Sequence, residues 1–270
     1  MIRKLLSNIE KISVGVRMGL ALAMFSIVTM ALQAAQQKPQ PPNISGAWER
    51  YGFNLGQPTA DGQRRDGTIP PRAEQPVVKP AYQKEYQDRL GAIRDANAKG
   101  APIASNYVEC LGDGMPLMMQ AMFPIEFLQS PGQVTVIEEA FTQVRRIKLD
   151  QPQKKIEDVE PGFYGHSVGH WEGDTLMVDT VGIKESIRYN NLPHSDQMRI
   201  KEKIHLVAPN ILWDEVTIED PVVLEKPFTI YYAYRRMPNY TLLEYICEDN
   251  REYTDKNGVQ QIRVGDTGRK

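Results

Sequence analysis

The fold is decided by the stretch WEGDTL at residues 171–176, where the pair Gly173-Asp174 separates two segments of alternating hydrophobicity. A two-residue turn of this composition between such segments predicts a β-hairpin. Turn residues recur at short intervals from residue 123 onward, at 130–133, 208–210 and 237–239. Between them lie short segments rich in Val, Ile, Thr, Tyr and Trp, without a helical pattern long enough for a crossover. We therefore predict a mainly β protein with about eight or nine strands, joined mostly by hairpins into an antiparallel sheet.

A sheet of this length avoids open edges by closing into an up-and-down β-barrel or by splitting into a β-sandwich. The first predicted strand, at residues 44–53, contains the triplet Gly46-Ala47-Trp48. This triplet resembles the Gly-x-Trp start of lipocalin-like (calycin) barrels. The resemblance favours an antiparallel, lipocalin-like barrel, and the β-sandwich stays open as the alternative.

The composition is that of an ordinary globular chain of 270 residues, with 41% hydrophobic and 24% charged residues and a net charge of -2. A charge so close to zero argues against nucleic acid as a partner. We expect one barrel domain over residues 44–254, with a long excursion rich in Gly, Pro, Arg and Gln at 57–78. Apolar residues at helical spacing predict a helix at 80–98. A linker at 36–43 precedes the domain, and a polar, frayed tail at 255–270 follows it.

The first 35 residues have the order of features typical of a secretory signal peptide. A basic start precedes an apolar, uncharged run at 18–32, and Ala34 and Ala35 follow it. The run is about 15 residues long, shorter than the roughly 20 needed to cross a bilayer, although an uncleaved anchor stays open. We expect a periplasmic or secreted protein with no stable membrane span after signal removal. Export permits a disulfide between Cys110 and Cys247, and two buried free thiols are the alternative.

Strand parity predicts a charged pair on the inner face of the sheet, because alternate side chains of a strand point to opposite faces. Over residues 198–207, Glu202 shares a face with four apolar side chains, and the other face carries three basic residues and a histidine. Over residues 143–149, Arg145 shares a face with Ile147 and Leu149. A carboxylate in apolar surroundings needs a partner, and a buried arginine is a suitable one. We predict that Arg145 pairs with Glu202, either as a structural ion pair or as the polar part of a ligand site.

A histidine near a buried carboxylate is a minimal arrangement for acid–base chemistry. His194 precedes the strand that carries Glu202. We predict His194 as a proton shuttle, Glu202 as the base or charge partner, and Arg145 as the anchor for developing negative charge. His166, His170 and His194 could together hold a metal ion, but the first two are about 13 Å apart along an extended strand. We predict no metal and no other cofactor, since the sequence also lacks a phosphate-binding glycine fingerprint.

Aromatic side chains complete the predicted ligand site. Tyr232 and Tyr234 share one face of a strand, where they either pack in the core or form a wall for a flat ligand. The predicted ligand contacts are Tyr232, Tyr234, Trp171 and His166. The expected ligand is a small apolar or aromatic molecule.

The runs WEGDTL (171–176), PHS (193–195) and TIEDP (217–221) together resemble a large group of exported bacterial proteins. The likeness covers about residues 44–250, and Arg145, His194, Ser195 and Glu202 match positions of its recurrent motifs. It implies export and the extent of the domain, and it implies no activity.

These observations favour an exported barrel that binds a small molecule and acts on it as a cofactor-independent isomerase, hydratase or lyase. A non-catalytic periplasmic carrier would use the same interior. An interaction module of the cell envelope, with its contacts on the 57–78 excursion, is the third possibility.

Overall fold

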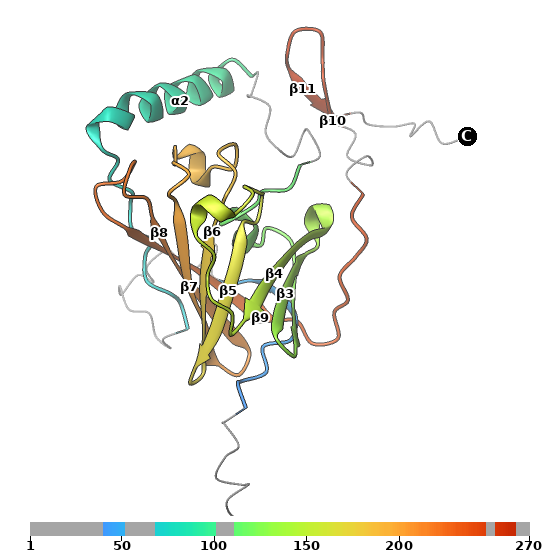
Figure 1. The fold of residues 1–270 in the computed structure, drawn as a ribbon. Coiled ribbons are helices and arrows are strands. Elements are labelled where there is room, and N and C mark those ends of the chain that lie inside the picture. The colour runs from blue at the N-terminus through green and yellow to red at the C-terminus, as the bar shows by residue number, and fades with distance from the viewer. Residues whose placement is uncertain (1–39, 52–67, 101–110, 247–251, 263–270) are drawn as a thin grey trace, which may run out of the picture. The chain divides into compact units, whose positions relative to one another are not determined.

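Nine β-strands close into a barrel in the order in which they occur along the chain (Figure 1). The computed structural model describes residues 40–51, 68–100, 111–246 and 252–262. The barrel belongs to a unit that begins at Pro42. Its strands are β1 (Gly46–Arg50), β2 (Ile125–Ser130), β3 (Gln133–Glu138), β4 (Gln143–Leu149), β5 (His166–Glu172), β6 (Thr175–Val181), β7 (Arg199–Ala208), β8 (Ile211–Glu219) and β9 (Phe228–Arg236). The prediction of a mainly β, closed barrel is confirmed.

The barrel is mostly antiparallel, including the pair β1–β9 that closes it, but the pair β4–β5 is parallel. Parallel neighbours need a crossover connection, because the chain must return to the end at which the first strand began. Residues 150–165 make this crossover, and they contain only the short 3-10 helix η3 (Ile156–Asp158). The expectation of a wholly antiparallel sheet is therefore corrected at this pair. The sequence pattern shows no helix there, and an irregular segment carries the crossover instead.

The hairpin predicted at 171–176 is confirmed as the turn between β5 and β6. Trp171 pairs with Leu176 and Glu172 with Thr175, so two residues form the loop. Gly173 has a φ of +58°, a left-handed conformation that glycine adopts without steric cost. The turn therefore depends on the glycine that predicted it.

Strand β1 closes the barrel, pairing with β2 on one side and β9 on the other. Trp48 on this strand is fully buried, and its indole Nε1 donates a hydrogen bond to the Ile44 carbonyl at 3.0 Å. The guanidinium of Arg236, from β9, lies 4.1 Å from the centre of the Trp48 ring. The Gly-x-Trp start thus packs at the seam where the first and last strands of the barrel meet.

The predicted helix at 80–98 is confirmed as α2 (Pro80–Ala98), which begins with a proline in its first turn. None of its residues is buried, and Tyr82 and Tyr86 pack partly buried against the barrel core. Glu85 forms an ion pair of 3.1 Å with Arg188, beside η4 (Tyr189–Asn191) in the β6–β7 connection. Figure 1 shows α2 across this end of the barrel. Within the described ranges, no helix has the length and apolar character needed to span a membrane.

Several predicted features lie outside the described residues: the signal segment, the first half of the linker, the first part of the 57–78 excursion, Cys110 and Cys247. The rest of the excursion packs along β8 and β9, where the Trp213 indole donates to the Thr68 carbonyl at 2.8 Å. The tail, which we expected to be frayed, contains part of a two-stranded hairpin. Its strands are β10 (Glu252–Thr254) and β11 (Gln260–Ile262).

Candidate functional site

The inner face of β7 carries Glu202, as strand parity predicted. The residue is 1% exposed, whereas the side chains of its neighbours Lys201 and Lys203 are each 51% exposed. Arg145 on β4 is also 1% exposed. The parity prediction is therefore confirmed for both members of the expected pair.

Arg145 and Glu202 form a bidentate ion pair inside the barrel, and neither side chain has any exposed surface. One guanidinium nitrogen, Nη1, donates to Glu202 Oε1 at 2.8 Å, and Nη2 donates to Oε2. Nη2 also donates to the hydroxyl of Thr180 on β6 at 2.9 Å, and Nε donates to the hydroxyl of Ser167 on β5 at 3.1 Å. The two hydroxyls are 2.8 Å apart. Three strands, β5, β6 and β7, thus place polar side chains around the one guanidinium that β4 supplies.

The charges of this pair stabilise each other. Burial by itself lowers the pKa of Arg145, but the adjacent Glu202 carboxylate outweighs it, and the net effect is a raised pKa. The guanidinium therefore stays charged, and the carboxylate beside it has a full counter-charge.

A second buried carboxyl, Asp214 on β8, lies next to Glu202. Glu202 pairs with Val216 across β7 and β8, and Asp214 is two residues along the same inner face. Burial, and then the negative charge of Glu202, raise the pKa of Asp214 well above its usual value. The raised pKa means that Asp214 holds its proton beside the charged carboxylate of Glu202. The sequence signal was available, because Asp214 alternates with the apolar residues Leu212 and Val216.

Tyr232 on β9 is the register partner of Asp214. It is 6% exposed, and burial raises the pKa of its hydroxyl well above the usual range. Among the residues that the structure describes, this hydroxyl has no hydrogen-bond partner. The neighbouring inner tyrosine differs: the hydroxyl of Tyr234 donates to the Met119 carbonyl. Both tyrosines predicted as ligand contacts face inward, and Tyr232 is the one with an unused hydroxyl.

His194 does not meet Glu202 in this structure. It lies in the β6–β7 connection, where Nε2 is 2.8 Å from the Ile187 carbonyl and Nδ1 is 2.9 Å from the Ser195 carbonyl. Glu202 is the fourth residue of the following strand, about 10 Å beyond its start at 3.3 Å per residue. The expected proton shuttle was inferred from proximity in sequence, and the ring is instead used to hold its own loop.

His166 faces away from the buried cluster, because the next residue, Ser167, points inward to Arg145. Its Nδ1 is 2.8 Å from the Gln153 side chain, in the crossover outside the barrel. His170 is exposed and contacts Glu172. Trp171 packs, partly buried, against the core. Within the described part of the chain, no three His, Cys, Asp or Glu side chains are grouped so that they could hold a metal ion.

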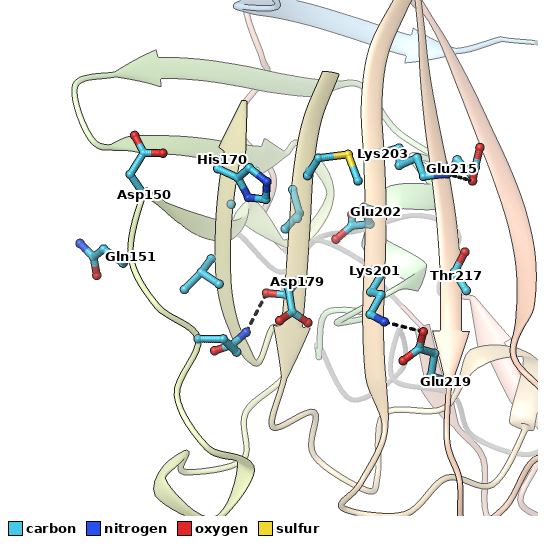
Figure 2. Close-up of a pocket in the computed structure, with 15 residues that line it drawn as sticks. Asp150, Gln151, His170, Asp179, Lys201, Glu202, Lys203, Glu215, Thr217 and Glu219 are labelled. Carbon is cyan, nitrogen blue, oxygen red and sulfur yellow. Dashed lines mark hydrogen bonds and ion pairs between the residues drawn. The ribbon is translucent and has the colours of Figure 1, made fainter. Parts of the chain in front are cut away.

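The outer face of β5 to β8 forms a recess of about 700 Å³ beside the crossover residues Asp150 and Gln151 (Figure 2). Its lysines are already paired, Lys201 with Glu219 at 2.7 Å and Lys203 with Glu215 at 2.8 Å. Glu202 lies at its base, but the carboxylate has no exposed surface. The recess therefore has a different chemistry from the interior, with paired and hydrated charges.

A second recess, of about 770 Å³, lies between α2 and the β6–β7 connection and includes His194 and Ser195. Here two of the sequence motifs meet. The Asp220 carboxylate accepts hydrogen bonds from the Ser195 hydroxyl at 2.9 Å and the Ser195 amide at 2.6 Å. It also accepts from the amides of Val222 and Val223, each at 3.0 Å. The PHS and TIEDP motifs thus join two connections at this end of the barrel.

No protein-family model matches the chain, and neither does any curated protein.

Proposed function

We propose that this chain is an exported barrel whose interior binds a small, largely apolar or aromatic molecule. The barrel then catalyses proton transfer to and from that molecule without a cofactor. One observation carries the proposal. The buried series Arg145, Glu202 and Asp214 crosses the barrel interior and ends beside the Tyr232 hydroxyl, which has no partner among the described residues. Buried charges are costly, and clustered titratable groups with shifted pKa values are typical of functional sites.

The carboxyl pair supplies both an acid and a base. Asp214 carries the proton, and Glu202 carries the charge that Arg145 balances. Isomerisation, hydration and elimination each need a proton removed at one atom and added at another, and such a pair can do both. His194 has no part in this chemistry, since both of its ring nitrogens face backbone carbonyls.

A non-catalytic carrier is the second candidate, and the contacts of Arg145 favour it. All three nitrogens of the Arg145 guanidinium donate hydrogen bonds within the barrel, to Ser167, Thr180 and Glu202. Because side chains of the barrel make all the hydrogen bonds of this charge pair, the pair can have a purely structural role, which is to fix the register of the strands around it.

The small molecules that copurify with the native protein distinguish these functions. We would identify them by untargeted mass spectrometry in wild type, Glu202→Gln and Asp214→Asn, with Glu219→Gln on the outer face as the control. In an enzyme, wild type and Glu219→Gln convert a recovered molecule, and the two inner variants retain it unchanged. In a carrier, every folded variant retains it and none converts it. If folded wild type retains no molecule and binds no anilinonaphthalene sulfonate, the proposed interior site is wrong.

The proposed export predicts a disulfide between Cys110 and Cys247. Described residues near each cysteine approach the connection between β3 and β4. Near Cys110, a Cβ added at Gly112 would lie 2.5 Å from Gln143 Oε1. Near Cys247, the centre of the Tyr245 ring is 4.9 Å from that of the Phe141 ring. We expect no thiol to react with maleimide in denatured, unreduced protein from the periplasm, and two to react after reduction. Reaction of both thiols before reduction would contradict the disulfide.

A further inference from the structure

Asp214 and Tyr232 are two buried polar side chains that face each other from neighbouring strands. They are register partners on β8 and β9, and both point into the barrel. Among the described residues, the Tyr232 hydroxyl has no hydrogen-bond partner, and neither Asp214 oxygen has one either. Buried polar groups nearly always have a partner, so this pair is the place in the interior where one is missing.

The protonation of the carboxyl pair decides what kind of partner is missing. Arg145 stabilises the negative charge on Glu202 through two hydrogen bonds, so the shared proton belongs to Asp214. Asp214 and Tyr232 make no hydrogen bond to each other, so the unprotonated oxygen of Asp214 needs a donor and the Tyr232 hydroxyl needs an acceptor.

A hydroxyl group supplies one donor and two acceptor positions on a single atom. Placed between the two side chains, it can donate to the free oxygen of Asp214 and accept from the hydroxyl of Tyr232. A carbonyl group could accept from Tyr232 but would leave the Asp214 oxygen without a donor. A carboxylate would bring a further negative charge beside Glu202, whose counter-charge is already used.

We propose that Asp214 and Tyr232 form the recognition pair for an uncharged hydroxyl group, so that the interior ligand is an alcohol or a phenol with an apolar body. This assignment rests on the proposed interior binding site and names its ligand class. In this assignment, Tyr232 selects ligands that have an oxygen atom between the Asp214 and Tyr232 side chains. Ile204, Val216 and Phe228 belong to the same buried core, so the surroundings of the pair suit an apolar ligand body.

Three aromatic probes test the assignment: phenol and toluene, which have nearly the same shape, and benzoate, which is larger and negatively charged. We would measure their dissociation constants by ligand-observed NMR or calorimetry with the full chain. Wild type should bind phenol about tenfold more tightly than toluene, the effect of one or two neutral hydrogen bonds. Benzoate should bind no better than toluene. A wild type that binds toluene as well as phenol, or benzoate better than phenol, would overturn the hydroxyl assignment.

Tyr232→Phe removes only the hydroxyl, and Tyr231→Phe removes the same group from the outer face of the same strand. The Tyr232 hydroxyl makes no hydrogen bond to described residues, so Tyr232→Phe should unfold at the wild-type denaturant concentration. It should lose the preference for phenol, and Tyr231→Phe should keep it. Asp214→Leu tests the second contact and should lose the same preference. A preference that persists in folded Tyr232→Phe and Asp214→Leu contradicts the assignment.

The two proposals fail differently. If phenol and toluene bind equally and are both displaced by a copurified molecule, the interior site stands and the recognition pair is wrong. If none of the three probes binds and no molecule copurifies, the proposed interior site itself is wrong, and the recognition pair with it.

Discussion

The two faces of β7 carry the same kind of ion pair in opposite surroundings. Outside, Lys201 and Lys203 reach Glu219 and Glu215 on β8, and half of each lysine side chain is in solvent. Inside, Glu202 meets Arg145 with no exposed surface on either side chain. The outer pairs are made by residues adjacent to Glu202 in sequence, so only the direction of the side chain separates the two environments.

A short distance between the two charges of an ion pair therefore does not measure how much the pair stabilises the fold. Exposed pairs contribute about 0.2–1 kcal/mol, because water screens them and the long side chains lose freedom. A buried pair gains more Coulomb energy, but removing both charges from water offsets much of that gain. Removing one charge of the inner pair should therefore be strongly destabilising, although the pair as a whole stabilises the fold only weakly. The outer pairs also stabilise weakly, but removing one of their charges should cost little.

Glu202→Gln should have the largest effect on stability. It leaves the buried guanidinium of Arg145 without a counter-charge, and we expect the free energy of unfolding to fall by about 3–5 kcal/mol. Urea unfolding followed by circular dichroism measures this loss.

The double variant Arg145→Met with Glu202→Leu is the matched control, because it removes both charges together. It should recover most of the stability lost in Glu202→Gln, as buried pairs replaced by apolar residues often do. A Glu202→Gln variant within about 1 kcal/mol of wild type would show that water or another anion reaches Arg145.

Glu138→Gln should change stability in the opposite direction, since Glu138 is buried without a paired cation among its described contacts. Its carboxyl accepts a hydrogen bond from Gln143, and burial, followed by the charge of Asp113, raises its pKa to about 9. The folded protein thus holds a proton that the unfolded chain releases above pH 4.5. Stability should fall as the pH rises from about 4.5 toward 9. The glutamine variant should be more stable by about 2–4 kcal/mol at pH 8 and equal to wild type near pH 4.

Urea unfolding of both proteins at pH 4, 6 and 8 checks this prediction. Glu126→Gln, on the outer face of the neighbouring strand β2, is the control for the loss of one carboxylate. A constant difference between Glu138→Gln and wild type at all three pH values would mean that the Glu138 carboxyl titrates normally.

Strand parity predicted the inner residues because it depends on local sequence alone. Arg145, Glu202 and Tyr232 lie on segments whose apolar residues alternate clearly, so their direction is fixed wherever the strands pair. The same rule applied to β8 would have found Asp214, but Asp214 and Glu215 are adjacent acids and neither stands out without an assigned face. The rule also shows why His166 was wrongly grouped with the interior, since Ser167 beside it takes the inward position.

Long-range arrangement could not be predicted in the same way. The parallel β4–β5 pair depends on how an irregular 150–165 segment returns along the barrel, and no local pattern records that path. Similarly, His194 is near Glu202 in sequence, but the loop ends at the rim of the barrel. The position of a loop side chain depends on the carbonyls it meets, here those of Ile187 and Ser195.

Thr180→Val should have an intermediate effect, because it breaks one contact of the buried pair and keeps both charges. The valine has nearly the shape of threonine but cannot accept from Arg145 Nη2 or bond to Ser167. A buried donor without a partner costs about 1–3 kcal/mol, and we expect this loss in urea unfolding. Thr217→Val, on the partly exposed outer face of β8, should lose less. Equal losses in the two variants would show that the inner hydroxyl adds nothing to the ion pair.

Glu219→Gln should have the smallest effect, because it breaks an exposed pair with Lys201. We expect a change in unfolding free energy below about 1 kcal/mol, and it should vanish in high salt, where exposed charges are screened. The loss in Glu202→Gln should persist in the same salt, since no ion reaches a side chain without exposed surface. The salt dependence therefore separates the two faces of β7 more sharply than the size of either effect. If both variants respond to salt alike, the interior of the barrel is open to solvent, and the inner carboxylate is no more protected than the outer one.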